Sequence, residues 1–464
     1  MAPAFGTSGL RGLVTELTPD LVSRYIRAFL ASCPQGRALY IGRDLRPSSP
    51  AIADVVIKAA QAAGIDTVEC GAQPTPALAM VAMEAGCGAV MVTGSHIPAD
   101  RNGLKFYIPS GEISKADEAA IKAAYEVDAA PAGAVGTALP APDTAKLYNL
   151  RYVKSFGETA LAGLRIGVYR HSSVARDAME EILRAMGAEV VALAHSDSFV
   201  PVDTEAVDPA TRDQLAQWCA THGLDAIVST DGDADRPMVT DARGVVIPGD
   251  VLGVITARLL GAKVICTPVS SNDMVRQIPE FTEIHLTKIG SPFVIAAMEA
   301  VLQADPATKV VGFEANGGFL LGFQAFQKSE ISPLMTRDSL LPILAPLVAA
   351  RQAGTGLAAL VAALPPCFTA ADRLQEIDRA KAAHFLADLV EDAQTRAEFF
   401  TTEGAIDTVD LTDGLRVNFV SGEVVHLRPS GNAPEFRVYA QAADPAQAQS
   451  LVMQIMQRVD HAIG

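Results

Sequence analysis

The sequence predicts an α/β fold: three similar mixed α/β domains, followed by a smaller α+β domain at the carboxyl-terminal end. The chain has 464 residues, enough for about three domains of roughly 150 residues each. Short apolar runs alternate with helical patterns through the first three quarters of the chain, which is typical of parallel sheets covered by helices. Beyond Pro365, short strand patterns follow one another closely, which favours an antiparallel sheet.

The first predicted domain covers residues 1–145. Its strands and helices are expected, in chain order, at 38–41, 49–63, 66–69, 76–85 and 89–92. The last of these strands leads directly into the polar segment Thr93-Gly-Ser-His96.

The second and third predicted domains, residues 146–248 and 249–364, repeat this order of elements. In the second, strands at 164–169, 189–192 and 224–228 and a helix at 174–186 lead to Asp231-Gly-Asp-Ala-Asp-Arg236. In the third, strands at 263–266, 283–286 and 309–311 and a helix at 294–302 lead to Gly312-Phe-Glu-Ala-Asn-Gly-Gly318. Ligands of parallel α/β sheets bind beyond the carboxyl ends of the strands, so we expect the three polar loops to face one shared site.

The last predicted domain, residues 365–464, follows the linker Leu364-Pro-Pro366. Short strands predict an antiparallel sheet packed against a terminal helix, with the strands at 415–419, 424–427 and 436–440 and the helix at 445–462.

Composition and charge narrow the class of protein. Hydrophobic residues make up 49% of the chain and charged residues 19%, so the chain is globular and not disordered. The 37 basic and 53 acidic residues give a net charge of −16, which opposes binding to nucleic acid or to an anionic membrane surface. Six cysteines without a C-x-x-C pair predict reduced thiols in a cytoplasmic protein. Neither an export signal nor a membrane-spanning segment is predicted.

Three aspartates follow the last predicted strand of the second domain at a spacing of two: Asp231, Asp233 and Asp235. Their mutual repulsion destabilises such a cluster unless a cation neutralises it, and a hard divalent ion such as Mg²⁺ is the natural partner. A solvated acidic turn is the alternative. An EF-hand is excluded, because Arg236 and Ala242 stand at its glycine and glutamate positions. A dehalogenase-type phosphotransferase, with Asp231 as its nucleophile, is a further alternative.

Ser95 and His96 stand close behind the last predicted strand of the first domain. A serine hydroxyl is a poor nucleophile unless a base or a metal activates it, so Ser95 is either an activated nucleophile or a helix N-cap. Pro98 stands where the nucleophile elbow of hydrolases has its second glycine, which excludes that motif. Taken alone, His96 is interpreted as a structural hydrogen-bonding residue.

Two further segments have side chains suited to a sugar phosphate. Arg428-Pro-Ser-Gly-Asn-Ala-Pro434, followed by Arg437, offers two guanidinium groups, a hydroxyl and an amide for a dianionic phosphate, and an ordinary hairpin is the alternative. Glu314 and Asn316 precede two glycines and can hydrogen-bond vicinal hydroxyls of a sugar, or they belong to a solvated glycine-rich turn.

Together these segments resemble the α-D-phosphohexomutase family, which includes phosphomannomutases, phosphoglucomutases and phosphoglucosamine mutases. The segments occur in the family's order over nearly the whole chain: Phe5-Gly-Thr-Ser-Gly-Leu-Arg-Gly12, Thr93-Gly-Ser-His-Ile-Pro98, Asp231-Gly-Asp-Ala-Asp-Arg236, Gly312-Phe-Glu-Ala-Asn-Gly-Gly318 and Arg428-Pro-Ser-Gly-Asn-Ala-Pro434. The resemblance implies four domains in a heart-shaped arrangement. It also implies interconversion of a hexose 6-phosphate and its 1-phosphate, with motifs most similar to those of bacterial phosphomannomutases.

The resemblance implies a role for each matching residue. Ser95 would be the phosphoserine, and the three aspartates of 231–235 would hold Mg²⁺ together with a phosphoserine oxygen. Arg11, His96 and Lys105 join Ser95 in the catalytic group, with Lys105 as a candidate acid/base. The remaining residues would bind the sugar phosphate: Arg236, Lys288, Glu314, Asn316, Arg428, Ser430, Gly431, Asn432 and Arg437.

The implied reaction passes through a hexose 1,6-bisphosphate, which also serves as the activator. The expected substrate is a mannose phosphate; a glucose phosphate, both sugars, or a glucosamine phosphate are alternatives within the family. A phosphoserine phosphatase-type hydrolase would transfer the phosphoryl group to water instead, and a silent protein would only bind the sugar phosphate. The active form is expected to be a monomer or a homodimer.

Overall fold

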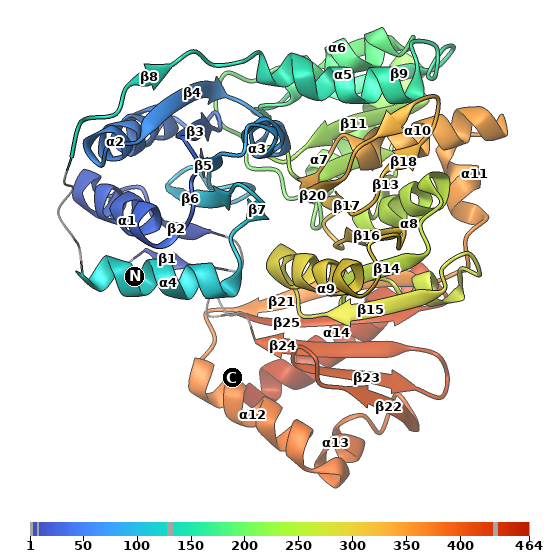
Figure 1. Cartoon of the computed structure of the whole chain (residues 1–464). Helices are drawn as coiled ribbons and strands as arrows, with labels where there is room; N and C mark the ends of the chain where they lie inside the picture. Colours follow the sequence, from blue (N-terminus) through green and yellow to red (C-terminus); the bar gives the residue numbers. More distant parts are fainter. Residues whose placement is uncertain (1–2, 7–8, 128–132, 430–434, 464) are drawn as a thin grey trace.

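The computed structural model describes residues 3–6, 9–127, 133–429 and 435–463. Four domains lie around a common centre. In the view of Figure 1 the first and second lie side by side, the third lies next to the second, and the fourth lies beneath the first and the third. The predicted architecture of three mixed α/β domains and a smaller α+β domain is confirmed.

The first domain is built on an eight-stranded sheet with the order β1-β2-β6-β5-β3-β4-β8, in which β7 pairs with β6. Its strands are β1 Ala4–Phe5, β2 Leu10–Leu13, β3 Ala38–Arg43, β4 Asp66–Ala72, β5 Gly88–Val92, β6 Arg101–Ile108, β7 Gly111–Glu112 and β8 Ala138–Leu139. Its helices are α1 Pro19–Ser32, α2 Ser49–Ala62, α3 Thr75–Glu84 and α4 Lys115–Val127. All strands and helices predicted for this domain are present, with shifts of a few residues at their ends.

The second and third domains each have a five-stranded sheet, with the orders β10-β9-β11-β12-β13 and β15-β14-β16-β17-β20. The elements of the second are α5 Thr144–Phe156, β9 Arg165–Tyr169, α6 Arg176–Ala185, β10 Glu189–Leu193, α7 Pro209–His222, β11 Ala226–Thr230, β12 Pro237–Thr240 and β13 Val246–Ile247. Those of the third are α8 Gly249–Leu260, β14 Val264–Pro268, η1 Asp273–Gln277, β15 Glu283–Thr287, α9 Ser291–Ala304, β16 Val310–Phe313, β17 Phe319–Leu321, β18 Ala325–Phe326, β19 Glu330–Ile331, β20 Leu334–Asp338, α10 Leu341–Ala353 and α11 Leu357–Ala362.

The three sheets share one plan, which differs in one respect from the expected parallel sheets. Three strand pairs are parallel in the first sheet and two in each of the others, but the next strand returns antiparallel: β6 beside β5, β12 beside β11 and β17 beside β16. The three polar loops are the connections of these antiparallel pairs. Each loop therefore starts at the carboxyl end of a buried parallel strand and is held at both ends by the same sheet.

Local sequence explains where the helices begin and end. Thr18 and Asp208 cap α1 and α7 by accepting hydrogen bonds from backbone N–H groups of the first turn, and a proline stands in that turn. Gly223 ends α7 with a φ of 59°, a left-handed conformation that costs glycine little.

The fourth domain has a five-stranded antiparallel sheet with the order β21-β25-β24-β23-β22. Its elements are β21 Phe368–Gln375, α12 Arg379–Glu391, α13 Ala393–Phe399, β22 Ile406–Asp410, β23 Leu415–Phe419, β24 Val424–Pro429, β25 Glu435–Ala442 and α14 Pro445–Ile463. The sequence patterns indicated the central strands and α14 but not β21 and β22, which are the edge strands and have only exposed or half-buried residues.

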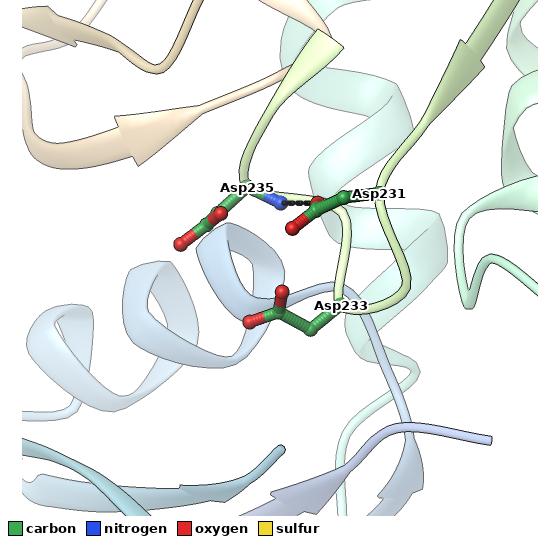
Figure 2. A group of neighbouring side chains, drawn as sticks. All are labelled: Asp231, Asp233 and Asp235. Carbon is green, nitrogen blue, oxygen red and sulfur yellow. Dashed lines mark hydrogen bonds between the residues drawn. The ribbon is translucent and has the colours of Figure 1, made fainter. Parts of the chain in front are cut away.

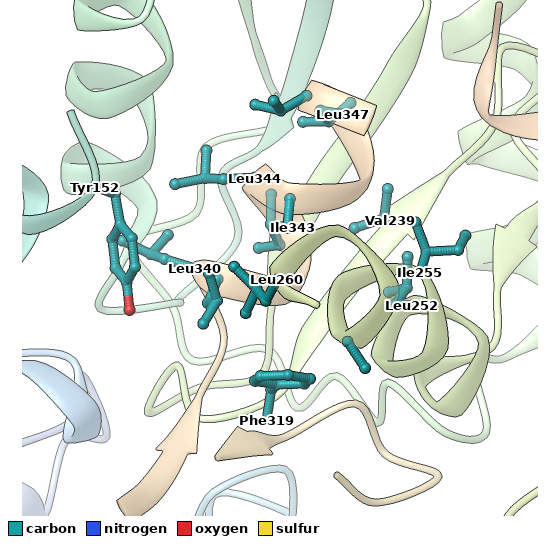
Figure 3. Packing of buried hydrophobic residues seen from close by; sticks show 14 of the residues in the cluster. Tyr152, Val239, Leu252, Ile255, Leu260, Phe319, Leu340, Ile343, Leu344 and Leu347 are labelled. Atoms are coloured by element: carbon teal, nitrogen blue, oxygen red, sulfur yellow. The ribbon is translucent and has the colours of Figure 1, made fainter. Parts of the chain in front are cut away.

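The largest hydrophobic core crosses domain borders. It joins α3 of the first domain, α5, the second sheet, α8 and α10, with Leu252, Phe319 and Leu344 among its buried side chains (Figure 3). The fourth domain has a separate core that includes Val417, Phe436 and Ile455. Each fully buried Leu or Phe contributes about 1.5–3 kcal/mol, so the shared core firmly joins the second and third domains and attaches α3 of the first. The first domain also has a separate core that includes Ile26, Val56 and Phe106.

Within the described ranges, none of the helices has the length and apolar character needed to cross a lipid bilayer.

Candidate active site

The metal-binding candidate is the turn between β11 and β12. Asp231 directly follows the fully buried strand β11, and Asp233 and Asp235 follow in the turn, with exposures of 0%, 0% and 1%. The backbone N–H of Asp235 donates to Asp231 Oδ1 at 3.2 Å, which folds the turn so that the three carboxylates converge (Figure 2). Carboxylate oxygens of the three residues lie within 4.8 Å of one another.

Cations from two other domains contact this acidic turn. Lys105 Nζ, from β6, lies 2.6 Å from Asp233 Oδ2 and 2.5 Å from Asp235 Oδ2. Arg337, from β20, lies 2.8 Å from Asp235 Oδ2. Burial raises the pKa of Asp231 well above its usual range, and the charges of Asp233 and Asp235 raise it further. Burial also acts to raise the pKa of Asp233, but the charge and hydrogen bond of Lys105, together with the hydrogen bonds of Thr75 and Asp231, lower it overall.

The donor set fits a hard divalent cation. Asp233 Oδ1 and Asp235 Oδ1 are buried and accept no hydrogen bond from any residue that the structure describes. A buried carboxylate oxygen without a hydrogen bond is costly, and three converging carboxylates supply the oxygen ligands that Mg²⁺ prefers. The residues therefore fit the predicted metal, and a solvated acidic turn is excluded because all three side chains are buried.

Ser95 lies against the acidic turn and not at a helix N-terminus. Its Oγ donates a hydrogen bond to Asp231 Oδ2 at 2.5 Å, and its N–H donates to Thr93 Oγ1 at 2.8 Å. Ser95 is 1% exposed, and its φ of 54° is in the left-handed region that serine rarely adopts. Thr75, at the start of α3, fixes the turn further by donating to Asp233 Oδ2 at 2.7 Å.

His96, Arg236 and Arg11 border this site. His96 Nδ1 lies 3.4 Å from Ser95 Oγ, and burial together with the charges of Arg236 and Arg11 lowers the pKa of His96 well below 6.5. The imidazole is therefore neutral at pH 7. Arg236 Nε lies 3.8 Å from Asp235 Oδ1. Burial, with the charges of Arg236 and Arg337, lowers the pKa of Arg11 to about 10, so it stays a cation at neutral pH.

The loop between β16 and β17 is joined to the acidic turn by Arg337. This guanidinium, 2.8 Å from Asp235, lies 3.6 Å from Glu314 Oε2 on its other side. Asn316 Oδ1 accepts the N–H of Gly318 at 3.0 Å, so this oxygen stabilises the loop itself. Glu314 and Asn316 are 3% and 8% exposed, which excludes a solvated turn.

The candidate phosphate clamp is a hairpin of the fourth domain. Arg428 in β24 stands opposite Arg437 in β25 in the strand register. Arg428 Nε donates to Asp413 Oδ1 at 2.9 Å, and the other oxygen of Asp413 accepts the N–H of Ile289 from the third domain at 2.9 Å. The predicted clamp residues Ser430, Gly431 and Asn432 lie outside the described residues.

The structure thus brings together the predicted residues of the first three domains: Ser95, His96, Lys105, Arg11, Asp231, Asp233, Asp235, Arg236 and Glu314. Lys288 is exposed, and the neighbouring Ile289 faces Asp413. Sequence reasoning missed Thr75, Arg337, and Thr204, whose Oγ1 donates to Asn316 O at 3.1 Å. Arg337 and Thr204 stand in no motif next to a parallel strand, so no local signal marked these two.

A buried serine hydroxyl on a buried acidic turn, with cations around it and Arg337 linking it to the carboxylate of Glu314, defines a phosphoryl-transfer site. On this four-domain fold, it defines an isomerase of the phosphomutase class.

Comparisons with known proteins identify the family. The four domain models of phosphoglucomutase/phosphomannomutase match in order: α/β/α domain I over residues 2–131, domain II over 146–244, domain III over 248–368 and the C-terminal domain over 369–458. The chain belongs to the α-D-phosphohexomutase family.

Two curated relatives match over nearly the whole chain. A phosphomannomutase of Sinorhizobium fredii (strain NBRC 101917 / NGR234) is 44% identical over 98% of this chain and 98% of its own length. A phosphomannomutase of Salmonella muenchen is 41% identical over 99% of this chain and 96% of its own. A crystal structure of a phosphoglucomutase/phosphomannomutase family protein from Burkholderia thailandensis, at 21% identity, covers 98% of this chain and 96% of its own with a TM-score of 0.76.

Proposed function

We propose that this protein is a phosphomannomutase that interconverts mannose 6-phosphate and mannose 1-phosphate. The observation that carries the proposal is the 2.5 Å hydrogen bond from Ser95 Oγ to Asp231 Oδ2, which aligns a nucleophile from one domain with an acidic turn from another. The 44% and 41% identical relatives, both named phosphomannomutases, support the choice of sugar.

In the proposed reaction, phosphorylated Ser95 transfers its phosphoryl group to the free hydroxyl of the hexose phosphate. The resulting hexose 1,6-bisphosphate reorients and returns its other phosphoryl group to Ser95. Lys105, Arg11 and Arg236 hold positive charge around the transferred group, where positioning and electrostatic stabilisation supply most of the catalysis. Mg²⁺, bound by the acidic turn, would supply further positive charge to the phosphoryl oxygens.

Proton transfer has two candidate groups. Lys105 donates hydrogen bonds to two carboxylates, so its ammonium group can give a proton to a substrate oxygen. It can accept a proton only after it has lost one and become a neutral amine. His96 has a neutral ring 3.4 Å from Ser95 Oγ and is placed to accept the serine proton when the hydroxyl attacks the bisphosphate. We assign the proton lost by the attacking sugar hydroxyl to Lys105 in its neutral amine form, and the proton lost by the Ser95 hydroxyl to His96.

Binding of the substrate is assigned to the third and fourth domains. Glu314 and Asn316 would bind ring hydroxyls, and Arg428, Arg437 and residues 430–432 would hold the phosphate that does not react. Lys288, next to Ile289, would contact the substrate from the third domain. We place the domain boundaries at residues 145, 248 and 364. We further propose that the active form is a cytoplasmic monomer or homodimer and that hexose 1,6-bisphosphate is its activator.

The test compares turnover of mannose 1-phosphate, glucose 1-phosphate and glucosamine 1-phosphate, with Mg²⁺ and the 1,6-bisphosphate present. We expect formation of the 6-phosphate from the mannose substrate, with no release of inorganic phosphate. Release of inorganic phosphate as the main product would favour a hydrolase, and binding without turnover of any of the three would favour a silent protein. Turnover of only the glucosamine substrate would show that the substrate is a glucosamine phosphate and not a mannose phosphate.

A further inference from the structure

A guanidinium that the proposed chemistry does not use lies directly behind the Ser95 loop. Arg46 follows β3 and is 1% exposed. Its two terminal nitrogens donate to four backbone carbonyls of the loop, those of Ser95 at 2.8 Å, Ile97 at 2.6 Å, Pro98 at 2.6 Å and Arg101 at 3.0 Å. A planar guanidinium has donors in a fixed fork, so these bonds fix the path of the loop.

Asp44 holds Arg46 and the start of the same loop. Its Oδ2 accepts from Arg46 Nε at 3.0 Å, from Thr93 Oγ1 at 2.8 Å and from Gly94 N at 3.3 Å. The guanidinium is thereby fixed in orientation by a fully buried carboxylate. A Cβ atom at Gly94 would lie 2.6 Å from Arg46 Cζ, so the guanidinium fills the space that a side chain there would need.

The second domain covers the other face of this guanidinium. Arg46 Cζ lies 4.1 Å from the ring centroid of Phe199, in the loop between β10 and α7. The same ring lies against Gly232 of the acidic turn, where a Cβ atom would be 3.1 Å from Phe199 Cε2 and 2.9 Å from Ser95 O. Phe199 therefore packs against both the support of the nucleophile loop and the turn that faces it.

The two oxygens of Ser95 are consequently fixed from opposite sides. The carbonyl accepts from Arg46 at 2.8 Å, and the hydroxyl donates to Asp231 at 2.5 Å. The left-handed φ of Ser95 persists only where the surroundings hold it, and the Arg46 bonds supply that restraint. Without them the loop can relax, and the hydroxyl leaves its position relative to the acidic turn.

We infer that Arg46 and Phe199 are positioning residues for phosphoryl transfer at Ser95, acting through the backbone of residues 95–101. The inference rests on the proposed function, since it assigns a role in that reaction. Displacing reacting atoms by about 1 Å can cost roughly a hundredfold in rate, whereas binding of the sugar phosphate by the third and fourth domains is left intact.

The test uses Arg46→Lys and Phe199→Leu in the full chain, with kcat and KM measured on mannose 1-phosphate and the phosphorylation rate of Ser95 measured with glucose 1,6-bisphosphate. We expect kcat and the phosphorylation rate to fall about a hundredfold in Arg46→Lys, because one ammonium cannot replace five directed N–H bonds. We expect a smaller decrease of kcat in Phe199→Leu and a kcat close to that of the wild type in Phe199→Tyr, which keeps the aromatic ring. KM should be unchanged in all three variants.

A matched pair in the fourth domain supplies the control. Arg458 Cζ lies 5.3 Å from the Phe399 ring, so Arg458→Lys and Phe399→Leu make the same chemical changes away from the site and should leave kcat unchanged. Normal kcat in both test variants, or a loss that appears in KM instead, overturns the inference. If Arg46→Lys fails to fold, Phe199→Leu decides, because it leaves every Arg46 hydrogen bond in place. A wild-type chain without mutase turnover would instead overturn the proposed function.

Discussion

Ser95 Oγ donates a 2.5 Å hydrogen bond to Asp231 Oδ2, and this buried hydrogen bond joins a residue of the first domain to a residue of the second. Asp231 lies 136 residues after Ser95 in the chain. Because both loops leave the carboxyl ends of buried strands, the two sheets position the hydroxyl and the carboxylate next to each other.

Replacing Ser95 by Ala should abolish mutase turnover and preserve the fold. The change removes one oxygen, leaves Asp231 with an unpaired carboxylate oxygen, and opens no apolar cavity. Turnover and the melting temperature check it, with binding of mannose 1-phosphate by calorimetry as the control for an intact site. Near-normal turnover would remove Ser95 from the role of nucleophile.

Asp233→Asn should weaken binding of Mg²⁺, since one anionic oxygen ligand becomes neutral in a site that selects hard charged oxygens. A metal titration followed by calorimetry measures the effect. Asp213→Asn, an exposed aspartate on α7, is the matched control and should bind as the wild type does. Equal metal affinity in both variants would exclude Asp233 from the site.

Arg428→Ala should raise KM for both the 1-phosphate and the 6-phosphate. The substrate must bind in two opposite orientations with its non-reacting phosphate in the same clamp, so one guanidinium serves both. The binding free energy of each substrate should weaken by about 1.5 to 3 kcal/mol, the range of a hydrogen bond to a charged group. An effect confined to one direction of the reaction would contradict a shared clamp.

Mannose and glucose 1-phosphates should have comparable turnover, with mannose somewhat favoured. The two sugars differ only at carbon 2, whereas Glu314 and Asn316 are assigned to the hydroxyls on carbons 3 and 4. A 4-deoxy analogue should lose most of its rate, because a buried polar group such as Glu314 is left unpaired. A 4-deoxy substrate turned over as fast as its parent would disprove this assignment.

His171 should make the fold less stable in acid. Burial is the main cause that lowers its pKa from 6.5 to about 4, and its Nε2 lies 2.8 Å from Thr230 O. The unfolded chain therefore binds a proton below pH 6.5 that the folded chain does not bind until about pH 4. The free energy of unfolding therefore decreases by about 3 kcal/mol as the pH falls from 6.5 to about 4.

Urea midpoints at pH 7 and pH 5 measure this loss. His171→Gln should show a smaller decrease between the two pH values than the wild type, and His384→Gln, whose side chain is 82% exposed, should match the wild type. Identical decreases in all three proteins would show that His171 does not titrate as described.

The sequence patterns predict the strands that precede the three loops because these strands are short apolar runs, such as Gly88–Val92 and Ala226–Thr230. They do not predict β6, Arg101–Ile108, because its buried residues include Asn102 and Lys105, whose partners come from distant segments. Buried polar residues interrupt the apolar pattern of a strand, so a strand that contains them is not recognised from the sequence.

The same reason explains which site residues the sequence reveals. The acidic turn, Ser95 and the clamp stand in local motifs, whereas Arg337 is an isolated arginine whose partners, Asp235 and Glu314, lie on other loops. Asp44 and Arg46 follow the parallel strand β3, so the criterion that selected the three loops would have selected them too.

The continuous core that joins α3, α5, α8 and α10 has a thermodynamic meaning. Most of its side chains come from the second and third domains, so unfolding of either one exposes buried side chains of the other. The first domain contributes α3 to this core but also has a separate core, which includes Ile26, Val56 and Phe106. The core of the fourth domain consists of its own side chains, such as Val417, Phe436 and Ile455, so its stability can change alone. The hairpin of Arg428 and Arg437 belongs to this fourth domain.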